Sequence, residues 1–240
     1  IIDNLTDFNV ISTYINGKLV SQNGKSFIEP VEVAKMNRFQ AEPLSLQDIM
    51  VKANEKKIKV IHAYDGQLIT GKLMVEPKIN RGNIECDTDR DILKIVVLNR
   101  YTKSIPAIGF IHGFGLKKGA MASTVAHDSH NIIALGSSDA DIVQAINKLI
   151  ESKGGICIAD SSQVLHLPLP VAGIMADKPG EKVAEDYQFI QQKAKNLGSS
   201  LQSPFMTLSF MALLVIPELK MSDKGLFDSN TFAITSLFEE

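Results

Sequence analysis

Short runs of apolar residues, separated by polar turn residues, predict strands along much of the chain. The first 29 residues are expected to be β, with a hairpin in which residues 10–15 and 18–20 pair across Asn16-Gly17. Asn-Gly favours this turn because both residues tolerate positive φ. Further strands are expected at residues 57–64, 67–75, 92–99, 105–111, 120–126, 131–135, 156–159 and 164–167.

Four segments have features of helices. Ser45 is expected to cap a helix over residues 46–53, with Asp48 at the capping-box position. Ser138 precedes the clearest helix, whose apolar residues share one face until Gly154-Gly155 ends it. The remaining two helices are expected at residues 181–196 and 204–214.

Together these elements predict an α+β fold, a mixed sheet domain with several packed helices, preceded by a short β-hairpin. Residues 30–44 are polar, contain Pro30 and Pro43, and are expected to form a linker. The expected organisation is therefore a β unit at 1–29, a linker at 30–44 and a domain at 45–240. Residues 80–90 carry many charges and are expected to form a loop. Because the chain begins without Met inside an expected strand, we expect a truncated sequence.

Composition narrows the class of protein. Hydrophobic residues make up 45% of the 240 residues, which excludes intrinsic disorder, and the net charge of −2 argues against a basic nucleic-acid module. No apolar run is long enough to cross a membrane. Only two cysteines, Cys86 and Cys157, occur, far apart, which fits a reducing compartment; the expected location is the cytoplasm.

The densest polar cluster lies at residues 126–131, between two expected strands. It contains His127, Asp128 and His130, and His112 lies not far upstream. Imidazoles can bind a divalent metal or transfer a proton near neutral pH, so metal binding and acid/base chemistry are both open. Strand alternation would put Asp128 and His130 on one face and His127 on the other. The residues alone equally allow a polar turn with local hydrogen bonds to the backbone.

A second candidate is the glycine-rich segment 111–119, which carries Lys117 and Lys118. Three glycines can let backbone amides approach an anion, although the segment lacks the Walker spacing. A flexible loop is the simpler interpretation of this segment.

Several separated strings resemble the C-terminal region of bacterial adenine deaminases. They include Gly115-Leu116-Lys117-Lys118-Gly119-Ala120, residues 123–131 (STVAHDSHN), residues 167–173 (LPLPVAG), residues 204–210 (PFMTLSF), residues 216–220 (IPELK) and residues 225–228 (GLFD). The resemblance spans roughly residues 45–230. The opening strands, with Gly17-Lys18-Leu19-Val20, resemble the end of the β-sandwich that follows the barrel in this family, so the hairpin is interpreted as a remnant of that sandwich.

The resemblance implies a hydrolase of the amidohydrolase superfamily that converts adenine to hypoxanthine and ammonia in purine salvage. Such enzymes hold a divalent metal, manganese, iron or zinc, in a (β/α)₈ barrel, for which this chain is too short. We therefore expect the fragment alone to be inactive and to need the missing N-terminal barrel as a partner, in an enzyme that forms a homo-oligomer. The resemblance implies no nucleic-acid or membrane partner.

The resemblance also suggests roles for individual residues. His127, Asp128 and His130 are expected to support catalysis at the barrel mouth, and Ser123, Asn131 and His112 to help bind adenine. No metal ligand is assigned in this chain. Two alternatives stay open: a noncatalytic interaction or oligomerisation domain, and an independent metal hydrolase centred on His112, His127, Asp128 and His130.

Overall fold

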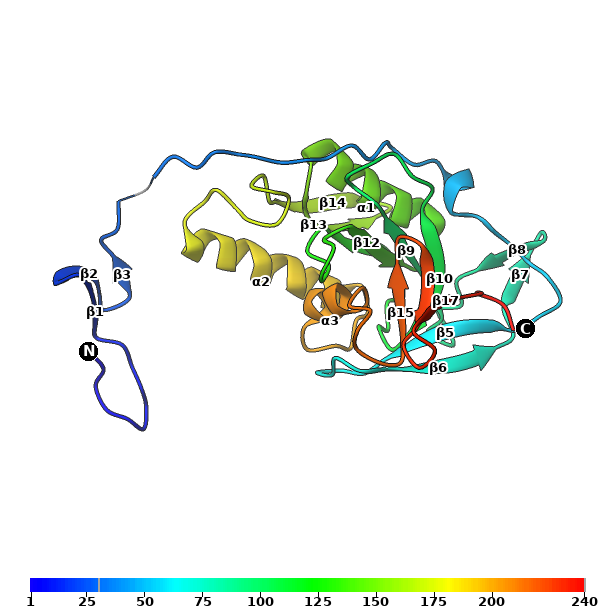
Figure 1. Ribbon diagram of the computed structural model, residues 1–240, viewed down its shortest axis with the longest axis horizontal. Coiled ribbons are helices and arrows are strands. Elements are labelled where there is room, and N and C mark those ends of the chain that lie inside the picture. Colours follow the sequence, from blue (N-terminus) through cyan, green and yellow to red (C-terminus); the bar gives the residue numbers. More distant parts are fainter. Residues whose placement is uncertain (30, 240) are drawn as a thin grey trace. The chain divides into compact units, whose positions relative to one another are not determined.

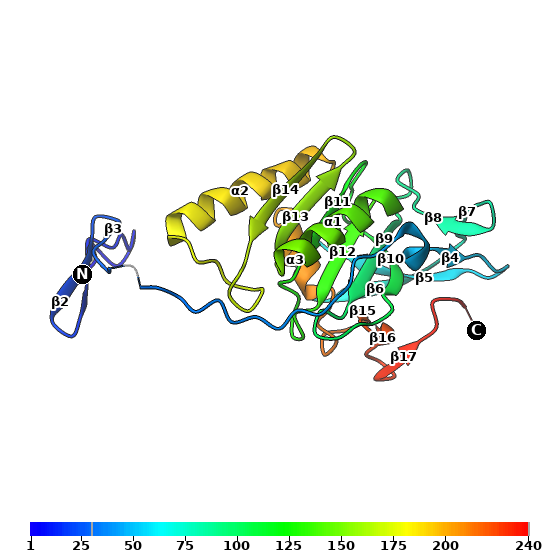
Figure 2. The ribbon, with the colours of Figure 1, turned by 90° about the horizontal axis from the view of Figure 1, so that it is seen from above.

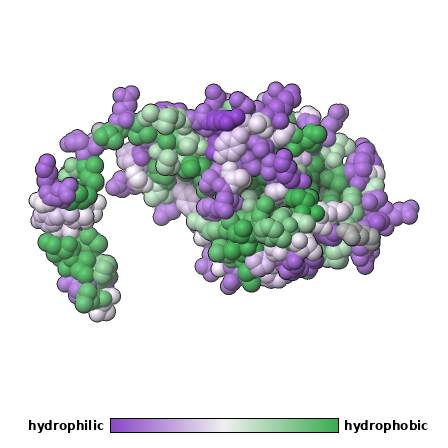
Figure 3. All heavy atoms as spheres, viewed as in Figure 1, coloured by the Kyte–Doolittle hydropathy of each residue, from purple (hydrophilic) through white to green (hydrophobic). Residues whose placement is uncertain are grey.

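The computed structural model describes residues 1–29 and 31–239, and its contacts divide the chain into two units at Ala34 and Lys35. The first unit is one antiparallel sheet of three short strands, β1 (Ser12–Ile15), β2 (Lys18–Gln22) and β3 (Lys25–Ser26). Asn16-Gly17 joins the first two strands with both residues at positive φ. Figure 3 shows hydrophobic residues gathered on this small unit, where Phe8, Tyr14 and Ile15 are exposed.

The second unit is built on a mixed sheet of eight strands (Figure 1). All neighbours pair antiparallel except β10 with β5, which are parallel. Across the sheet the order is β14 (Gln163–Pro168), β13 (Gly155–Asp160), β11 (Ala120–Ser123), β12 (Ile132–Gly136), β9 (Leu93–Leu98), β10 (Ala107–His112), β5 (Ile58–Ala63) and β6 (Thr70–Val75).

Helices cover both faces of this sheet (Figure 2). The amphipathic helix α1 (Asp139–Ser152) packs on one face, while α2 (Gly180–Asn196) and α3 (Pro204–Phe210) help to cover the other. Strand β9 is therefore buried along its whole length, as expected for a strand between two apolar layers. The α+β architecture that the sequence predicts is confirmed, and so is α1 with Ser138 as its cap.

Two smaller sheets complete the second unit. One consists of β15 (Leu219–Ser222), β16 (Gly225–Asp228) and β17 (Ala233–Thr235), and the other of β4 (Val51–Lys52), β8 (Asn83–Glu85) and β7 (Lys78–Asn80). The loop expected at 80–90 was partly wrong, because Asn83–Glu85 forms strand β8, which a tight turn at Arg81-Gly82 joins to β7.

The helix expected at 46–53 was also wrong in extent. The capping box of Ser45 and Asp48 is present, but it begins only a single 3₁₀ turn, η1 (Leu46–Ile49), before β4. Likewise, α3 ends at Phe210 rather than continuing to residue 214. In both segments the helical periodicity of the sequence is weak, and packing against the rest of the domain decides where the helix ends.

The segment that begins the second unit, after Lys35, packs against the rest of that unit. The Asn37 side-chain amide donates to the Lys153 carbonyl at 2.6 Å, and the Gln40 backbone N–H donates to the Arg100 carbonyl at 2.7 Å. Of the residues expected as a linker, 35–44 thus make tertiary contacts, while Pro30 lies outside the described residues, as does Glu240 at the end of the expected domain. No helix in the described part is long and apolar enough to cross a membrane.

Candidate functional site

The 126–131 cluster forms the connection between β11 and β12. Ser123 ends β11, and its hydroxyl accepts the Val125 backbone N–H at 2.9 Å, which turns the chain away from the strand direction. The His130 backbone N–H donates to the Ala126 carbonyl at 2.6 Å and closes the turn. The local polar turn is therefore the geometry that the structure has.

This turn brings the two histidines together, which an extended strand would separate. The ring centroids of His127 and His130 lie 5.7 Å apart, with planes 69° to each other, and the His127 ring also lies 4.8 Å from that of Phe210. The His127 backbone N–H donates to the Ser209 carbonyl at 3.1 Å, so the end of α3 supports the turn. Asp128 is exposed between the histidines in sequence.

Burial lowers the pKa of His130, and the neighbouring charges of His127 and Arg100 lower it further, while Asp128 opposes them. Its imidazole is therefore neutral at neutral pH. Nδ1 faces the Ala126 N–H at 3.4 Å, an arrangement in which the ring proton sits on Nε2. A neutral imidazole can both donate and accept a hydrogen bond, which suits recognition of a purine or transfer of a proton.

Arg100, which the sequence did not predict as a site residue, holds the turn in place from inside the domain. Its side chain is 3% exposed, and Nε donates to the His130 carbonyl at 2.5 Å. Tyr101, the next residue, donates its hydroxyl hydrogen to the Ser129 carbonyl at 2.9 Å. The sequence signal for Arg100 is weak: the residue comes two positions after the end of the largely apolar strand β9, where it is buried.

Asn131 and Ser123 are both buried, each 2% exposed. The Asn131 Oδ1 accepts the Arg100 backbone N–H at 3.4 Å, and Ser123 bonds to Val125. Their observed contacts support the turn from inside rather than present groups to solvent.

His112 lies at the other end of the sheet. The register runs from Ser123 to Ile133, from Ile133 to Val97 and from Val97 to Ala107. His112 follows Ala107 by five residues on β10, so it lies roughly 16 Å further along and three strands across, more than about 20 Å from Ser123. The structure does not bring it to the turn.

At that far end His112 has its own neighbours. Its ring lies 4.7 Å from that of His62 on the adjacent parallel strand, and its Nδ1 is buried with no hydrogen-bond partner in the described part of the chain. Burial and the neighbouring His112 lower the pKa of His62. Among residues 1–29 and 31–239, no third side chain joins this pair in a group that could hold a metal ion.

The backbone amides of the glycine-rich segment do bind an anionic group, but that group is a carboxylate of the protein itself. Asp91 accepts the Gly113 and Gly115 N–H groups, each at 2.8 Å. The Lys117 and Lys118 N–H groups are directed to the Leu197 carbonyl. These backbone amides are therefore used within the fold and do not form an open anion cradle.

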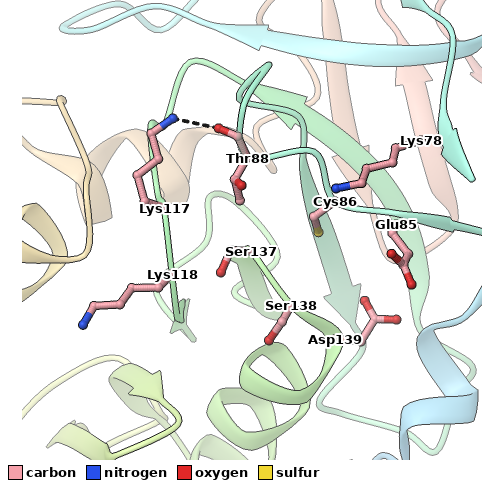
Figure 4. Close-up of a pocket in the computed structure, with 9 residues that line it drawn as sticks. All are labelled: Lys78, Glu85, Cys86, Thr88, Lys117, Lys118, Ser137, Ser138 and Asp139. Atoms are coloured by element: carbon pink, nitrogen blue, oxygen red, sulfur yellow. Dashed lines mark hydrogen bonds between the residues drawn. The ribbon is translucent and has the colours of Figure 1, made fainter. Parts of the chain in front are cut away.

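A cavity of about 460 Å³ lies beside this segment (Figure 4). Lysines 78, 117 and 118 line it with the start of α1, yet Glu85 and Asp139 line it too. Ser138 caps α1 by accepting the Asp141 N–H, and Asp139 pairs with the buried Lys94 at 2.6 Å. The polar groups at the helix start are thus already engaged within the protein.

The described residues do not fit a metal centre. Among residues 1–29 and 31–239, no three His, Cys, Asp or Glu side chains are grouped so as to hold an ion. Burial raises the pKa of Cys86 to about 11 and that of Cys157 to about 12, so both stay protonated thiols at neutral pH.

Comparison of the amino-acid sequence with known proteins shows the family of this chain. The family model described as adenine deaminase C-terminal domain matches residues 67–233, more than half of the chain. The chain belongs to this family. The matched segment includes the whole 126–131 turn as well as Arg100 and α3.

Relatives named adenine deaminase are similar to this chain over nearly its whole length. The chain is 48% identical to the protein of Methanosarcina mazei, with 100% of the chain and 45% of that protein covered. For Salinibacter ruber the identity is 46%, over 99% of the chain and 44% of the relative. For Borreliella burgdorferi it is 42%, over 94% and 41%. The chain therefore spans less than half the length of these relatives, and its resemblance to the C-terminal region of adenine deaminases is confirmed.

Proposed function

We propose that this chain is the C-terminal part of an adenine deaminase, which hydrolyses adenine to hypoxanthine and ammonia. The observation that carries the proposal is the similarity of the whole chain to proteins of that name, which are more than twice as long. The catalytic barrel of the amidohydrolase superfamily would belong to the other part of the enzyme, with its manganese, iron or zinc ion. Because the described residues do not fit a metal centre, we assign no step through a metal to this chain.

Within this proposal, the 126–131 turn faces the mouth of the barrel and positions the purine. Water adds its oxygen to C6 of adenine, the bond from C6 to the amino nitrogen breaks, and protons move to that nitrogen as ammonia leaves. Neutral His130 can donate to a ring nitrogen, and the exposed Asp128 carboxylate can accept from the amino group. His127 stacks on Phe210 and holds the outer side of the turn.

Arg100, Ser123 and Asn131 keep these groups in place from inside the domain. His112 is too far along the sheet to act at the same point, and we do not include it in this site. The enzyme is proposed to act in the cytoplasm, in purine salvage.

The first unit is proposed to belong to the β-sandwich that follows the barrel. Supporting this, its single sheet leaves Phe8, Tyr14, Ile15 and Ile28 exposed, which a second sheet would cover. In this scheme residues 1–29 belong to the sandwich, residues 30–44 are the linker, and residues 45–240 form the C-terminal domain.

Ammonia release from adenine tests the proposal. We expect no activity from the 240-residue chain alone or from the N-terminal portion of the Methanosarcina mazei relative alone. Activity should return when that portion is joined to this chain in a chimera, because the barrel and its cover are then both present. Deamination by the 240 residues alone would instead support an independent hydrolase, and an inactive but folded chimera would contradict the proposal.

A noncatalytic role in oligomerisation is the second candidate, favoured by the exposed apolar side chains of the first unit. It predicts that deleting this chain from the chimera leaves adenine hydrolysis intact but lowers the molar mass measured by light scattering. The deaminase proposal predicts the loss of hydrolysis, whichever oligomer forms.

A further inference from the structure

Arg100 carries a positive charge that the described part of the chain does not neutralise. Its side-chain hydrogen-bond acceptors are the His130 carbonyl, the Asn37 Oδ1 at 3.3 Å and the Tyr101 hydroxyl at 3.0 Å, all uncharged. The rings of Phe39 and Tyr101 lie 5.7 and 4.6 Å from its central carbon. No carboxylate within the described residues forms an ion pair with it.

A guanidinium has five N–H groups, and three of those of Arg100 have an acceptor, which leaves two. Buried charges in proteins are normally paired, and a group that is 3% exposed has little water to replace a partner. The three neutral acceptors fix the plane of the guanidinium but provide no counter-ion for its positive charge.

Arg100 is one of the residues that line a pocket of about 470 Å³. A second arginine, the exposed Arg38, lies on the same pocket, together with Asn37, Tyr101 and His130, and Met36 and Ile174 supply apolar wall. No aspartate or glutamate lines it. The cavity beside α1 differs, because its three lysines are accompanied by Glu85 and Asp139.

We propose that this pocket is a binding site for an oxyanion, the phosphate or carboxylate group of a small molecule, held by Arg100 and Arg38. Paired guanidinium groups suit such ligands because their N–H groups match two oxygens of one anion. The apolar wall would contact the uncharged part of the molecule. This inference does not depend on the assignment of deaminase activity.

His130 supplies an independent readout of the bound anion. Its pKa is now lowered by burial and by the charges of His127 and Arg100. An anion in the pocket would oppose the positive neighbour and raise the pKa of His130. Binding elsewhere on the domain would leave the titration of this ring unchanged.

The test is NMR titration of the 240-residue chain with sodium phosphate and, separately, sodium acetate, at constant ionic strength kept with sodium chloride. We expect saturable shifts of the Arg38 and Tyr101 amides and an increase in the His130 pKa. Tighter binding of phosphate would assign a phosphate ligand, and tighter binding of acetate a carboxylate ligand.

Variants make the assignment specific. Arg38→Gln, on the exposed rim, should weaken binding about tenfold because a charge-assisted contact is lost. Arg100→Lys, which keeps the charge but loses the fork, should weaken it as well. The control Arg81→Gln, an exposed arginine in the β7–β8 turn, should bind like the unchanged chain. The proposal is overturned by no saturable shift with either anion, by shifts confined to the lysines beside α1, or by equal weakening in the Arg38 and Arg81 variants.

Discussion

Replacing Asp139 with alanine is expected to lower the free energy of unfolding by about 3 kcal/mol. Lys94 is fully buried near the start of β9, and its ammonium has two partners, the Asp139 carboxylate at 2.6 Å and the Ile49 carbonyl at 2.9 Å. The variant leaves this charge buried without a counter-ion, which typically costs about 3–5 kcal/mol. Partial exposure of Asp139 admits some water and puts the expected cost at the lower end of that range.

The matched variant Lys94→Met removes the buried charge instead. Methionine fills a similar volume, and Asp139, about one-third exposed, can then turn to water. We expect a change within about 1 kcal/mol, mostly from the lost partner of the Ile49 carbonyl. Urea unfolding followed by circular dichroism measures both values. If both variants lowered the free energy of unfolding equally, the cost of Asp139→Ala would not come from leaving the buried charge of Lys94 without a counter-ion.

Gly173→Ala is expected to cost about 3–4 kcal/mol and to disturb the 126–131 turn. Gly173 has φ +72°, where a non-glycine residue is strained by about 1–2 kcal/mol, and a β-carbon there would clash with Nη1 of Arg100. Because the guanidinium is buried and bound on three sides, it has nowhere to move without breaking its contact with the His130 carbonyl. The Thr124 hydroxyl, which donates to the Gly173 carbonyl at 2.5 Å, would move with it.

Gly180→Ala is the control for this substitution. Gly180 begins α2, and a β-carbon there would meet no atom within 4 Å. Its unfolding free energy should stay the same or rise by a few tenths of a kcal/mol, since alanine favours a helix. If Gly173→Ala were equally neutral, as judged by urea unfolding, Arg100 would not be fixed in the way described.

The sequence predicts elements best where local pattern and tertiary packing agree. Helix α1 has a serine cap, an apolar face and a glycine after its end, so it was found with its limits nearly correct. The strands β15 and β16 were missed because each has only four residues, too short a run for its pattern to stand out, and β15 carries a lysine, Lys220. Lys220 is nonetheless fully buried, with its ammonium on the Leu68 carbonyl, and only the tertiary fold reveals that.

The candidate site was predictable in part for the same reason. A local cluster such as residues 127–130 can be read from the sequence, whereas the geometry that joins His127 to His130 depends on a turn closed by backbone bonds. Arg100 contacts the turn, and Gly173 packs against Arg100, each from another part of the chain, and no spacing rule relates them. His112, near in sequence, is separated by strand register, which sequence distance does not convey.

The value of kcat/KM for adenine, measured with turn variants of the chimera that joins this chain to the barrel portion of its relative, tests the central claim most directly. We expect His130→Ala and Asp128→Ala each to lower kcat/KM by about a hundredfold, in the range typical of lost proton-transfer or positioning groups, and His127→Ala to lower it less. Ser129→Ala is the control, because its side chain is exposed and only its carbonyl is used in the turn. Losses in the His130 and Asp128 variants with a normal Ser129 variant are the predicted result; unchanged kcat/KM in all of them would contradict a role for the turn at the active site.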